Sequence, residues 1–182
     1  MIKQTKFSSR YVLALDPSGA YKEGYGTTGW CLLDLKTSKI MKFGYISASN
    51  YSAQFQYWDA HIALIDSLAG YHPDIVVEDY LLYGDRANAQ INSRLETPQL
   101  LGIIKYETYK RGMFVYIQTA LQVKVRWSDE VLVRKGIIRE EAGSYFIGTT
   151  RLSNHIRDAI RHAFHYATYN SNYKGGYEDA YE

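Results

Sequence analysis

Short apolar segments alternate with polar loops along the chain, and their lengths predict both strands and helices. The run YVLALD (residues 11–16) is followed by Pro-Ser-Gly, as expected of a buried strand that ends in a loop. Residues 28–35 and 40–47 are two further strand candidates, joined by the polar turn KTSK. Together the three segments predict consecutive antiparallel strands at the start of the fold.

Two later segments complete the set of predicted strands. In DIVVED (residues 74–79) three apolar residues follow one another without a polar interruption, which is typical of a parallel strand covered on both faces. The run MFVYIQ (residues 113–118) is the fifth strand candidate. Crossover connections between parallel strands of the predicted sheet should be right-handed.

The remaining segments carry helical spacing of apolar residues or helix-capping residues. They are residues 51–69, 99–112, 119–127 and 128–141, and a last helix that starts near residue 154. Thr97 and Pro98 are expected to cap the second of these helices and to open its first turn. Ser153 or Asn154 is expected to cap the last one, and residues 143–150 are predicted to form a loop.

This order of elements predicts an α/β protein with a mixed five-stranded sheet and helices on both faces. A chain of 182 residues fits one domain of ordinary size. We expect that domain to span residues 1–170 and to be followed by a flexible polar tail over residues 171–182.

The composition indicates where in the cell the protein works, but it identifies no binding partner. The net charge of +2 is too small to indicate a nucleic-acid partner by itself. The single cysteine, Cys31, lies in an apolar run and cannot form an internal disulfide, which suits a reducing cytoplasm. The first residues resemble neither a signal peptide nor a membrane span, so we expect a soluble intracellular protein. The 18 tyrosines can stack on bases, although tyrosines more often pack at half-buried positions.

Acidic residues end two of the predicted buried strands and begin the last helix. Asp16 closes the first strand, Glu78 closes the fourth, and Asp158 lies early in the helix. Ligands of open α/β sheets gather beyond the carboxyl ends of strands, so the three residues converge if the strands are neighbours. Clustered carboxylates repel one another unless a cation lies among them, and oxygen ligands suit Mg²⁺ or Mn²⁺. Taken singly, each acid has an ordinary alternative role in a turn, at a solvated strand end or at a helix dipole.

The last helix also carries three of the five histidines of the chain. In NHIRDAIRHAFHYA, spacings of three and four place His155, Asp158, His162 and His165 along one helix face. We expect His162 at most to hydrogen-bond a ligand residue, and His165, two turns beyond Asp158, to be structural.

Five motifs follow one another in an order known from one nuclease family. They are LALDPSG, TTGWCLLD, PDIVVED, QVK and HIRDAIRHA. In order and approximate spacing they resemble the motifs of the RuvC-type Holliday junction resolvases, which belong to the RNase H-like superfamily. The resemblance covers about residues 11–169, and it includes the phage-encoded members of the family.

The resemblance implies a metal site and its residues. Asp16, Glu78, His155 and Asp158 take the positions of the metal ligands, with two Mg²⁺ or Mn²⁺ ions in each active site. Lys124, in the QVK motif, matches a lysine that contacts the scissile phosphate, although a solvated helix residue is an equal alternative. Lys135 is the candidate for a second family lysine.

The resemblance also implies DNA-binding residues. An aromatic or apolar residue shortly after the second acid lies near the crossover of the junction, and Tyr80, Leu81 and Tyr83 are the candidates. Lys124 and a set of arginines are candidates for contacts to phosphates. The arginines are Arg86, Arg94, Arg126, Arg134, Arg151, Arg157 and Arg161.

The implied function is that of a crossover junction endodeoxyribonuclease in the cytoplasm of a bacterial or phage-infected cell. A homodimer would nick two strands of a four-way junction and leave a 5′ phosphate and a 3′ hydroxyl. A related nuclease acting on flaps, forks or RNA–DNA hybrids remains a close alternative. An ATP-binding protein of the sugar-kinase and actin fold would need two such domains, for which 182 residues are too few. The intact acids argue against a DNA-binding protein with a dead site.

Three features depart from the family pattern. The loop between Asp16 and Thr28 is longer, with residues 19–26 as the additional segment. Ser18 separates Pro17 from the following glycine, which puts the local backbone at the site in question. Asp79 is an extra acid, whose side chain should point to the opposite face of the strand from Glu78.

Overall fold

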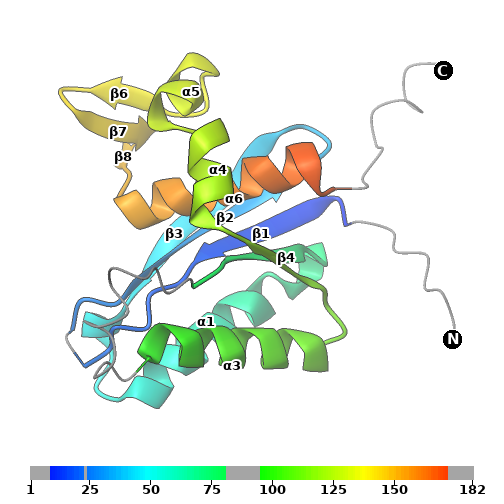
Figure 1. Cartoon of the computed structure of the whole chain (residues 1–182), viewed down its shortest axis with the longest axis vertical. Helices are drawn as coiled ribbons and strands as arrows, with labels where there is room; N and C mark the ends of the chain where they lie inside the picture. The colour runs from blue at the N-terminus through cyan, green and yellow to red at the C-terminus, as the bar shows by residue number, and fades with distance from the viewer. Residues whose placement is uncertain (1–8, 23, 81–94, 172–182) are drawn as a thin grey trace, which may run out of the picture.

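The structure is a computed structural model that describes residues 9–22, 24–80 and 95–171. Figure 1 shows the arrangement of its elements. In chain order they are β1 Tyr11–Asp16, β2 Thr27–Asp34, β3 Lys39–Ser47, η1 Ala48–Asn50, α1 Gln54–Ser67, η2 Ala69–Tyr71, β4 Asp74–Glu78, α3 Glu96–Lys110, β5 Val115–Gln118, α4 Ala120–Arg126, α5 Asp129–Arg134, β6 Arg139–Glu141, β7 Ser144–Ile147, β8 Thr150–Arg151 and α6 Asn154–Tyr169. The roles expected of Leu81, Tyr83, Arg86 and Arg94 lie outside the described residues, as does all of the tail expected over residues 171–182 except Ser171.

Strands β1 to β5 form one mixed sheet in the order β3-β2-β1-β4-β5. β1 pairs antiparallel with β2, and β2 with β3, whereas β4 lies parallel to β1, and β5 lies parallel to β4. The apolar runs of β1 and β4 are buried because these strands lie inside the sheet and are covered on both faces. The predicted mixed five-stranded sheet is therefore confirmed.

Helices cover both faces of this sheet, as predicted (Figure 1). Successive side chains of a strand point to opposite faces. Leu13 and Leu15 accordingly pack in a core with α1 and α3, whereas Val12 and Ala14 pack in a second core with α6. We call these faces the α1 face and the α6 face. No helix in the described ranges combines the length and the apolar character needed to cross a membrane.

Helix α6 runs antiparallel to β4 across the α6 face. Near the helix end, the Tyr166 hydroxyl donates to the carboxylate of Asp74 at the start of β4 (2.7 Å). One turn earlier, His162 is hydrogen-bonded to Glu78 at the end of β4 (2.8 Å). The first turns of α6 therefore lie at the sheet edge where β1 and β4 end.

The prediction of a loop over residues 143–150 is wrong, because part of this segment belongs to a second, small sheet. β6, β7 and β8 pair antiparallel in this order. Between β6 and β7, Ala142 and Gly143 have positive φ values of 49° and 71°, the combination that suits a tight hairpin turn. The strands contain only two to four residues, so no alternation of apolar and polar positions could identify them.

The start of α3 also differs from the prediction. The helix begins at Glu96, and no side chain caps it. The hydroxyl of Thr97 instead accepts a hydrogen bond from the backbone N–H of Gly19 (3.0 Å). A Cβ atom on Gly19 would lie 2.2 Å from the Glu96 backbone, so only glycine fits this approach. Thr97 thus fastens the long loop after β1 and does not act as a helix cap.

Candidate metal centre

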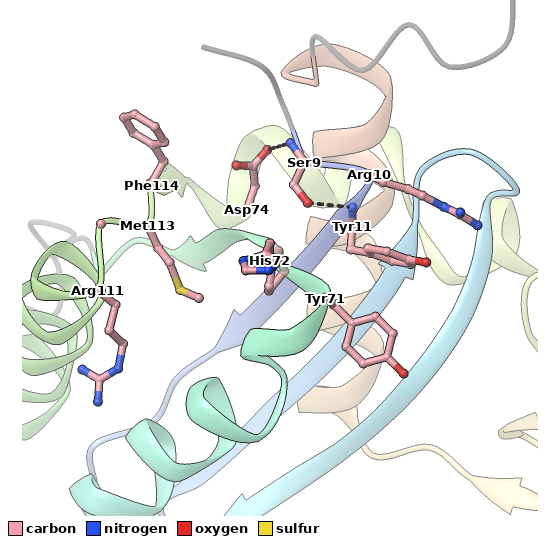
Figure 2. Close-up of a pocket in the computed structure, with 11 residues that line it drawn as sticks. Ser9, Arg10, Tyr11, Tyr71, His72, Asp74, Arg111, Met113 and Phe114 are labelled. Carbon is pink, nitrogen blue, oxygen red and sulfur yellow. Dashed lines mark hydrogen bonds between the residues drawn. The ribbon is translucent and has the colours of Figure 1, made fainter. Parts of the chain in front are cut away.

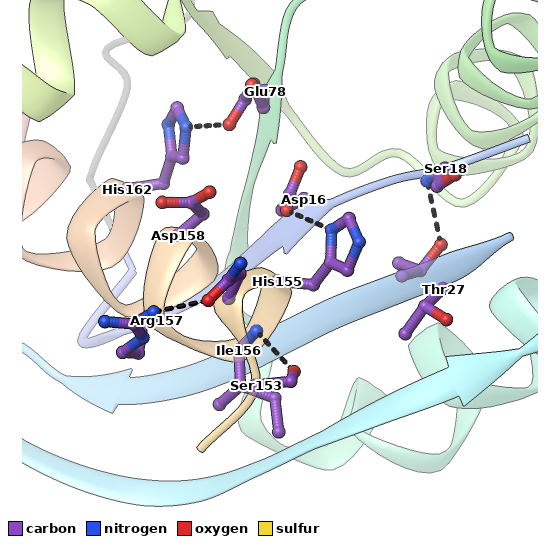
Figure 3. Close-up of polar contacts among 12 residues, drawn as sticks. Asp16, Ser18, Thr27, Glu78, Ser153, His155, Ile156, Arg157, Asp158 and His162 are labelled. Carbon is purple, nitrogen blue, oxygen red and sulfur yellow. Dashed lines mark hydrogen bonds and ion pairs between the residues drawn. The ribbon is translucent and has the colours of Figure 1, made fainter. Parts of the chain in front are cut away.

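Asp16, Glu78 and Asp158 meet at one edge of the sheet (Figure 3). Each offers a carboxylate oxygen, and these three atoms lie within 4.8 Å of one another. Asp16 ends β1 and Glu78 ends β4, and the carboxyl ends of parallel neighbours lie at the same edge. We call the three residues the acidic cluster.

Two local features bring the start of α6 to the acidic cluster. The Ser153 side chain caps the helix, with its hydroxyl oxygen accepting from the backbone N–H of Ile156 (3.3 Å; Figure 3). Gly29 of β2 lies beneath the first turn, where a Cβ atom would lie 2.1 Å from the backbone of His155. Gly29 is also the partner of Asp16 in the β1–β2 register. Helix and strand can therefore approach closely enough for Asp158 to reach Asp16.

Replacing Gly29 by alanine is expected to displace the start of α6 and to separate Asp158 from Asp16. Overpacking of this kind costs about 1–3 kcal/mol of unfolding free energy. Denaturant unfolding measures that loss. The matched control is Gly102→Ala in α3, where a Cβ atom meets no atom of the described residues within 4 Å. This control should be stabilising, because alanine favours helix by about 1 kcal/mol over glycine. Equal stability of both variants would contradict the close approach.

Asp16 is nearly buried, with 8% of its surface exposed. Burial raises the pKa of Asp16, and the charges of Glu78 and Asp158 raise it further, although the hydrogen bond from His155 opposes them. His155 Nδ1 lies 2.7 Å from Asp16 Oδ2, and this hydrogen bond raises the pKa of His155. A bound cation would therefore relieve the repulsion between the carboxylates of the acidic cluster.

Two cations contact Asp158, one at each carboxylate oxygen. Lys124 Nζ lies 3.0 Å from Asp158 Oδ2, and the Arg161 guanidinium pairs with Asp158 Oδ1. Burial by itself lowers the pKa of Lys124, but the hydrogen bond to Asp158 and the nearby carboxylates raise it overall. The amine of Lys124 therefore carries its charge at the rim of the acidic cluster.

His162 is fully buried and hydrogen-bonds Glu78, as expected from the sequence. Its Nδ1 lies 2.9 Å from Gln118 Oε1, and the amide of Gln118 donates to Asn170 Oδ1 (3.1 Å). The carboxylate of Glu78 is thereby oriented by buried His162, which buried Gln118 holds in turn. His165 lies further along the helix, and its ring contacts that of Tyr169.

Arg157 and Arg161 do not face outward toward a nucleic acid, contrary to one expectation from the sequence. Their side chains are only 12% and 10% exposed, and both pair with Asp129 of α5 at 2.5 Å. Arg157 also stacks on the ring of Tyr145 in β7 (4.2 Å). Asp129 was not predicted to have this role, because the sequence carries no signal beyond its place in the first turn of a helix.

The other candidate DNA-binding residues have mixed positions. Tyr80 is half-buried and packs against the core of the α1 face. The Arg126 guanidinium lies 4.7 Å from the ring centre of Tyr169 and donates to its hydroxyl (3.0 Å). Lys124 is the candidate that the structure brings to the acidic cluster.

The donor set of this edge suits a divalent cation. Three carboxylates supply hard oxygen ligands, the preference of Mg²⁺ and Mn²⁺, and a neutral His155 could add a nitrogen ligand. One of these carboxylates, Asp16, is buried among like charges, a costly placement without a cation. The residues present therefore fit such an ion.

Two solved structures resemble the chain over most of its length. One is Thermus thermophilus RuvC in complex with a Holliday junction substrate, with a TM-score of 0.63, 16% sequence identity, and coverage of 87% of this chain and 93% of the other. The other is a further Thermus thermophilus RuvC structure, with a TM-score of 0.59, 18% identity, and coverage of 87% and 94%. The chain has the RuvC fold. The RNase H-like class predicted from the motifs is thus confirmed for the fold, whereas no family model and no curated protein sequence matches the chain.

A pocket of about 500 Å³ lies at the opposite end of the RuvC-fold sheet, where β1 and β4 begin (Figure 2). Its arginines are engaged with the protein, since Arg10 pairs with Asp34 (2.6 Å) and Arg111 pairs with Asp66 (2.6 Å). Asp74 accepts from the backbone N–H of Ser9 (3.1 Å) and from Tyr166. Arg10, Arg111 and Asp74 therefore stabilise the fold, and the candidate metal centre lies at the opposite end of the sheet.

Proposed function

We propose that the protein is a metal-dependent endonuclease that resolves four-way DNA junctions by paired nicks. The observation that carries this proposal is the acidic cluster at the edge where β1 and β4 of a RuvC fold end. The proposal is also supported by the described complex of Thermus thermophilus RuvC with a Holliday junction substrate, a fold relative over most of both chains.

In this proposal Asp16, Glu78 and Asp158 hold Mg²⁺ or Mn²⁺, with His155 as the fourth ligand. Two such ions supply Lewis-acid activation of a water and stabilisation of the leaving oxygen. Water oxygen bonds to phosphorus as the P–O3′ bond breaks, which leaves a 5′ phosphate and a protonated 3′ oxygen. His162 and Arg161 keep the carboxylates of Glu78 and Asp158 in their orientations.

The proposed enzyme acts as a homodimer. A four-way junction has near two-fold symmetry, and two symmetric active sites would place one nick in each of two opposed strands. Exposed cations around the site would bind phosphates without regard to sequence, so junction affinity should fall as salt rises.

The experiment incubates the wild-type protein with a labelled four-way junction, a flap, an RNA–DNA hybrid and a linear duplex, each with Mg²⁺, with Mn²⁺ or with EDTA. We expect paired nicks in the junction, with either metal only, and little cutting of the duplex. A protein that cuts none of these substrates is no nuclease of this class. Preferred cutting of the flap or the hybrid would favour the related nucleases over a resolvase.

Replacing Lys124 by methionine is expected to slow cleavage more than it weakens binding. Its charge lies at the rim of the acidic cluster, where negative charge develops on the phosphate during the reaction. Loss of such a group costs on the order of 10²-fold in rate. Single-turnover kinetics measures the rate, and a gel-shift titration in EDTA measures binding. The matched comparison is Lys135→Met: Lys135, the candidate for a second family lysine, lies over the ring of Trp127, and in the described residues it forms no ion pair with the acidic cluster. Equal rates for both variants would refute this role.

A further inference from the structure

A buried polar network lies on the α1 face, on the opposite side of the sheet from the acidic cluster. It contains Thr28 of β2 together with Tyr57 and His61 of α1, and all three are fully buried. Thr28 precedes Gly29, whose open face receives α6, so its own side chain points to the α1 face. The network therefore contacts β2 on the face of the sheet opposite to α6 and Asp158.

The direction of each hydrogen bond follows from its partners. His61 Nδ1 lies 2.7 Å from the carbonyl oxygen of Tyr57, which only accepts, so Nδ1 carries the hydrogen. Burial lowers the pKa of His61 to about 4, so the ring is neutral near pH 7 and Nε2 is an acceptor. Thr28 must then donate its hydroxyl hydrogen to His61 Nε2 (2.8 Å). The Thr28 oxygen is left with lone pairs that can only accept.

Ser18, which follows Asp16 and Pro17, is held by the oxygen of Thr28 and by the hydroxyl of Tyr57. The backbone N–H of Ser18 donates to Thr28 Oγ1 (3.2 Å), and the Tyr57 hydroxyl donates to the Ser18 carbonyl oxygen (2.6 Å). Pro17 has no N–H, so Ser18 offers the first backbone donor after Asp16. Both polar backbone groups of Ser18 are thus fixed by side chains from the α1 face.

We propose that His61 is a positioning residue: through Thr28 it holds the backbone N–H of Ser18, whose carbonyl oxygen the Tyr57 hydroxyl holds, and it thereby sets the direction in which Asp16 enters the acidic cluster. This inference rests on the proposed function, because it assigns His61 a part in metal binding and cleavage. Without a fixed acceptor at His61, the Thr28 hydroxyl could turn its hydrogen toward the N–H of Ser18, which would break the hold on the loop.

The chain offers a contrast that separates this role from ordinary packing. Thr108 of α3 is as fully buried as Thr28, but its hydroxyl has no hydrogen-bond partner among the described residues. Replacing either threonine by valine keeps the shape of the side chain and removes one hydroxyl. Only the change at Thr28 should alter the metal affinity or the cleavage rate of the acidic cluster.

The experiment compares Thr28→Val, Thr28→Ser and Thr108→Val with the wild type. Calorimetric titration of the DNA-free proteins with Mn²⁺ gives metal affinity, and single-turnover cleavage of the junction gives the rate. We expect Thr28→Val to lose roughly tenfold or more in Mn²⁺ affinity or rate, as outer partners of metal ligands do. Thr28→Ser, which keeps the oxygen, and Thr108→Val should stay close to wild type.

A second measurement uses the unmodified protein and needs neither folding of a variant nor activity. Long-range ¹H–¹⁵N spectra of the histidine rings should show His61 neutral with its hydrogen on Nδ1. A hydrogen on Nε2 would reverse the direction of the network and overturn the proposal.

The remaining outcomes are equally decisive. Wild-type behaviour of Thr28→Val, or equal losses in both valine variants, would leave His61 with a packing role only. If the wild type cuts no substrate, the proposed function fails, whereas the Mn²⁺ affinities and the ring spectra still decide the role of His61.

Discussion

Asp16→Asn is expected to abolish junction cleavage without lowering the stability of the metal-free protein. The carboxylate of Asp16 lies among two others within 4.8 Å, so its removal takes a ligand from the proposed ion and also relieves repulsion. Asparagine keeps an oxygen that can accept from His155. The cleavage rate should fall by at least roughly 10³-fold, the scale for loss of a preorganised charged group. Gel assays with Mg²⁺ measure the rate, and thermal unfolding in EDTA measures stability.

The control for this prediction is Asp79→Asn. Asp79 follows Glu78 directly but does not belong to the acidic cluster, and we expect this variant to cut the junction as the wild type does. If Asp16→Asn retained cleavage, the metal-nuclease proposal would fail. If Asp16→Asn unfolded at a much lower temperature, Asp16 would instead be a structural residue.

Asp129→Asn is expected to cause the largest loss of stability. Asp129 pairs with both Arg157 and Arg161, whose side chains are almost buried, so asparagine leaves two cations without this counter-charge. Removing one partner of a buried ion pair lowers the free energy of unfolding by about 3 kcal/mol. For a domain of this size we expect the melting temperature to fall by roughly 6–12 °C. Cleavage measured well below that temperature should fall much less than in Asp16→Asn.

Asp66→Asn is the matched control for Asp129→Asn. Asp66 also pairs with an arginine, Arg111, but its side chain is 53% exposed. Water screens such a pair, so the stability should change little. Similar melting temperatures for both variants would mean that burial does not set the strength of the Asp129 contacts.

Much of the fold could be predicted from the sequence because its signals are local. The apolar runs that form β1 and β4 have the uninterrupted pattern of covered parallel strands, and Ser153 caps α6 as expected. The small sheet of β6 to β8 escaped prediction since its strands are too short to carry a period. Thr97 was misassigned because its partner, Gly19, is distant in the chain.

The residues of the candidate site likewise include some that the sequence could predict and some that it could not. Asp16, Glu78 and Asp158 could be nominated because they end strands or begin a helix, and because the surrounding motifs resemble a family. Of the groups that hold these acids, His162 could be nominated from its spacing on the last helix, whereas the others could not. Arg161 meets Asp129, and His61 meets Thr28, only after folding has joined separate elements. No spacing along the chain distinguishes such a histidine from one that merely packs.

Cys31 gives the protein a practical advantage for labelling. It is the only cysteine of the chain and is fully buried in β2, where burial raises the pKa of its thiol. Thiol reagents attack the thiolate, so the native chain should stay unlabelled while it is folded. A Tyr25→Cys variant, at a position that is 82% exposed in the loop after β1, would therefore accept a fluorophore at one defined place. Energy transfer from that place to a labelled DNA arm would report how this loop approaches a junction.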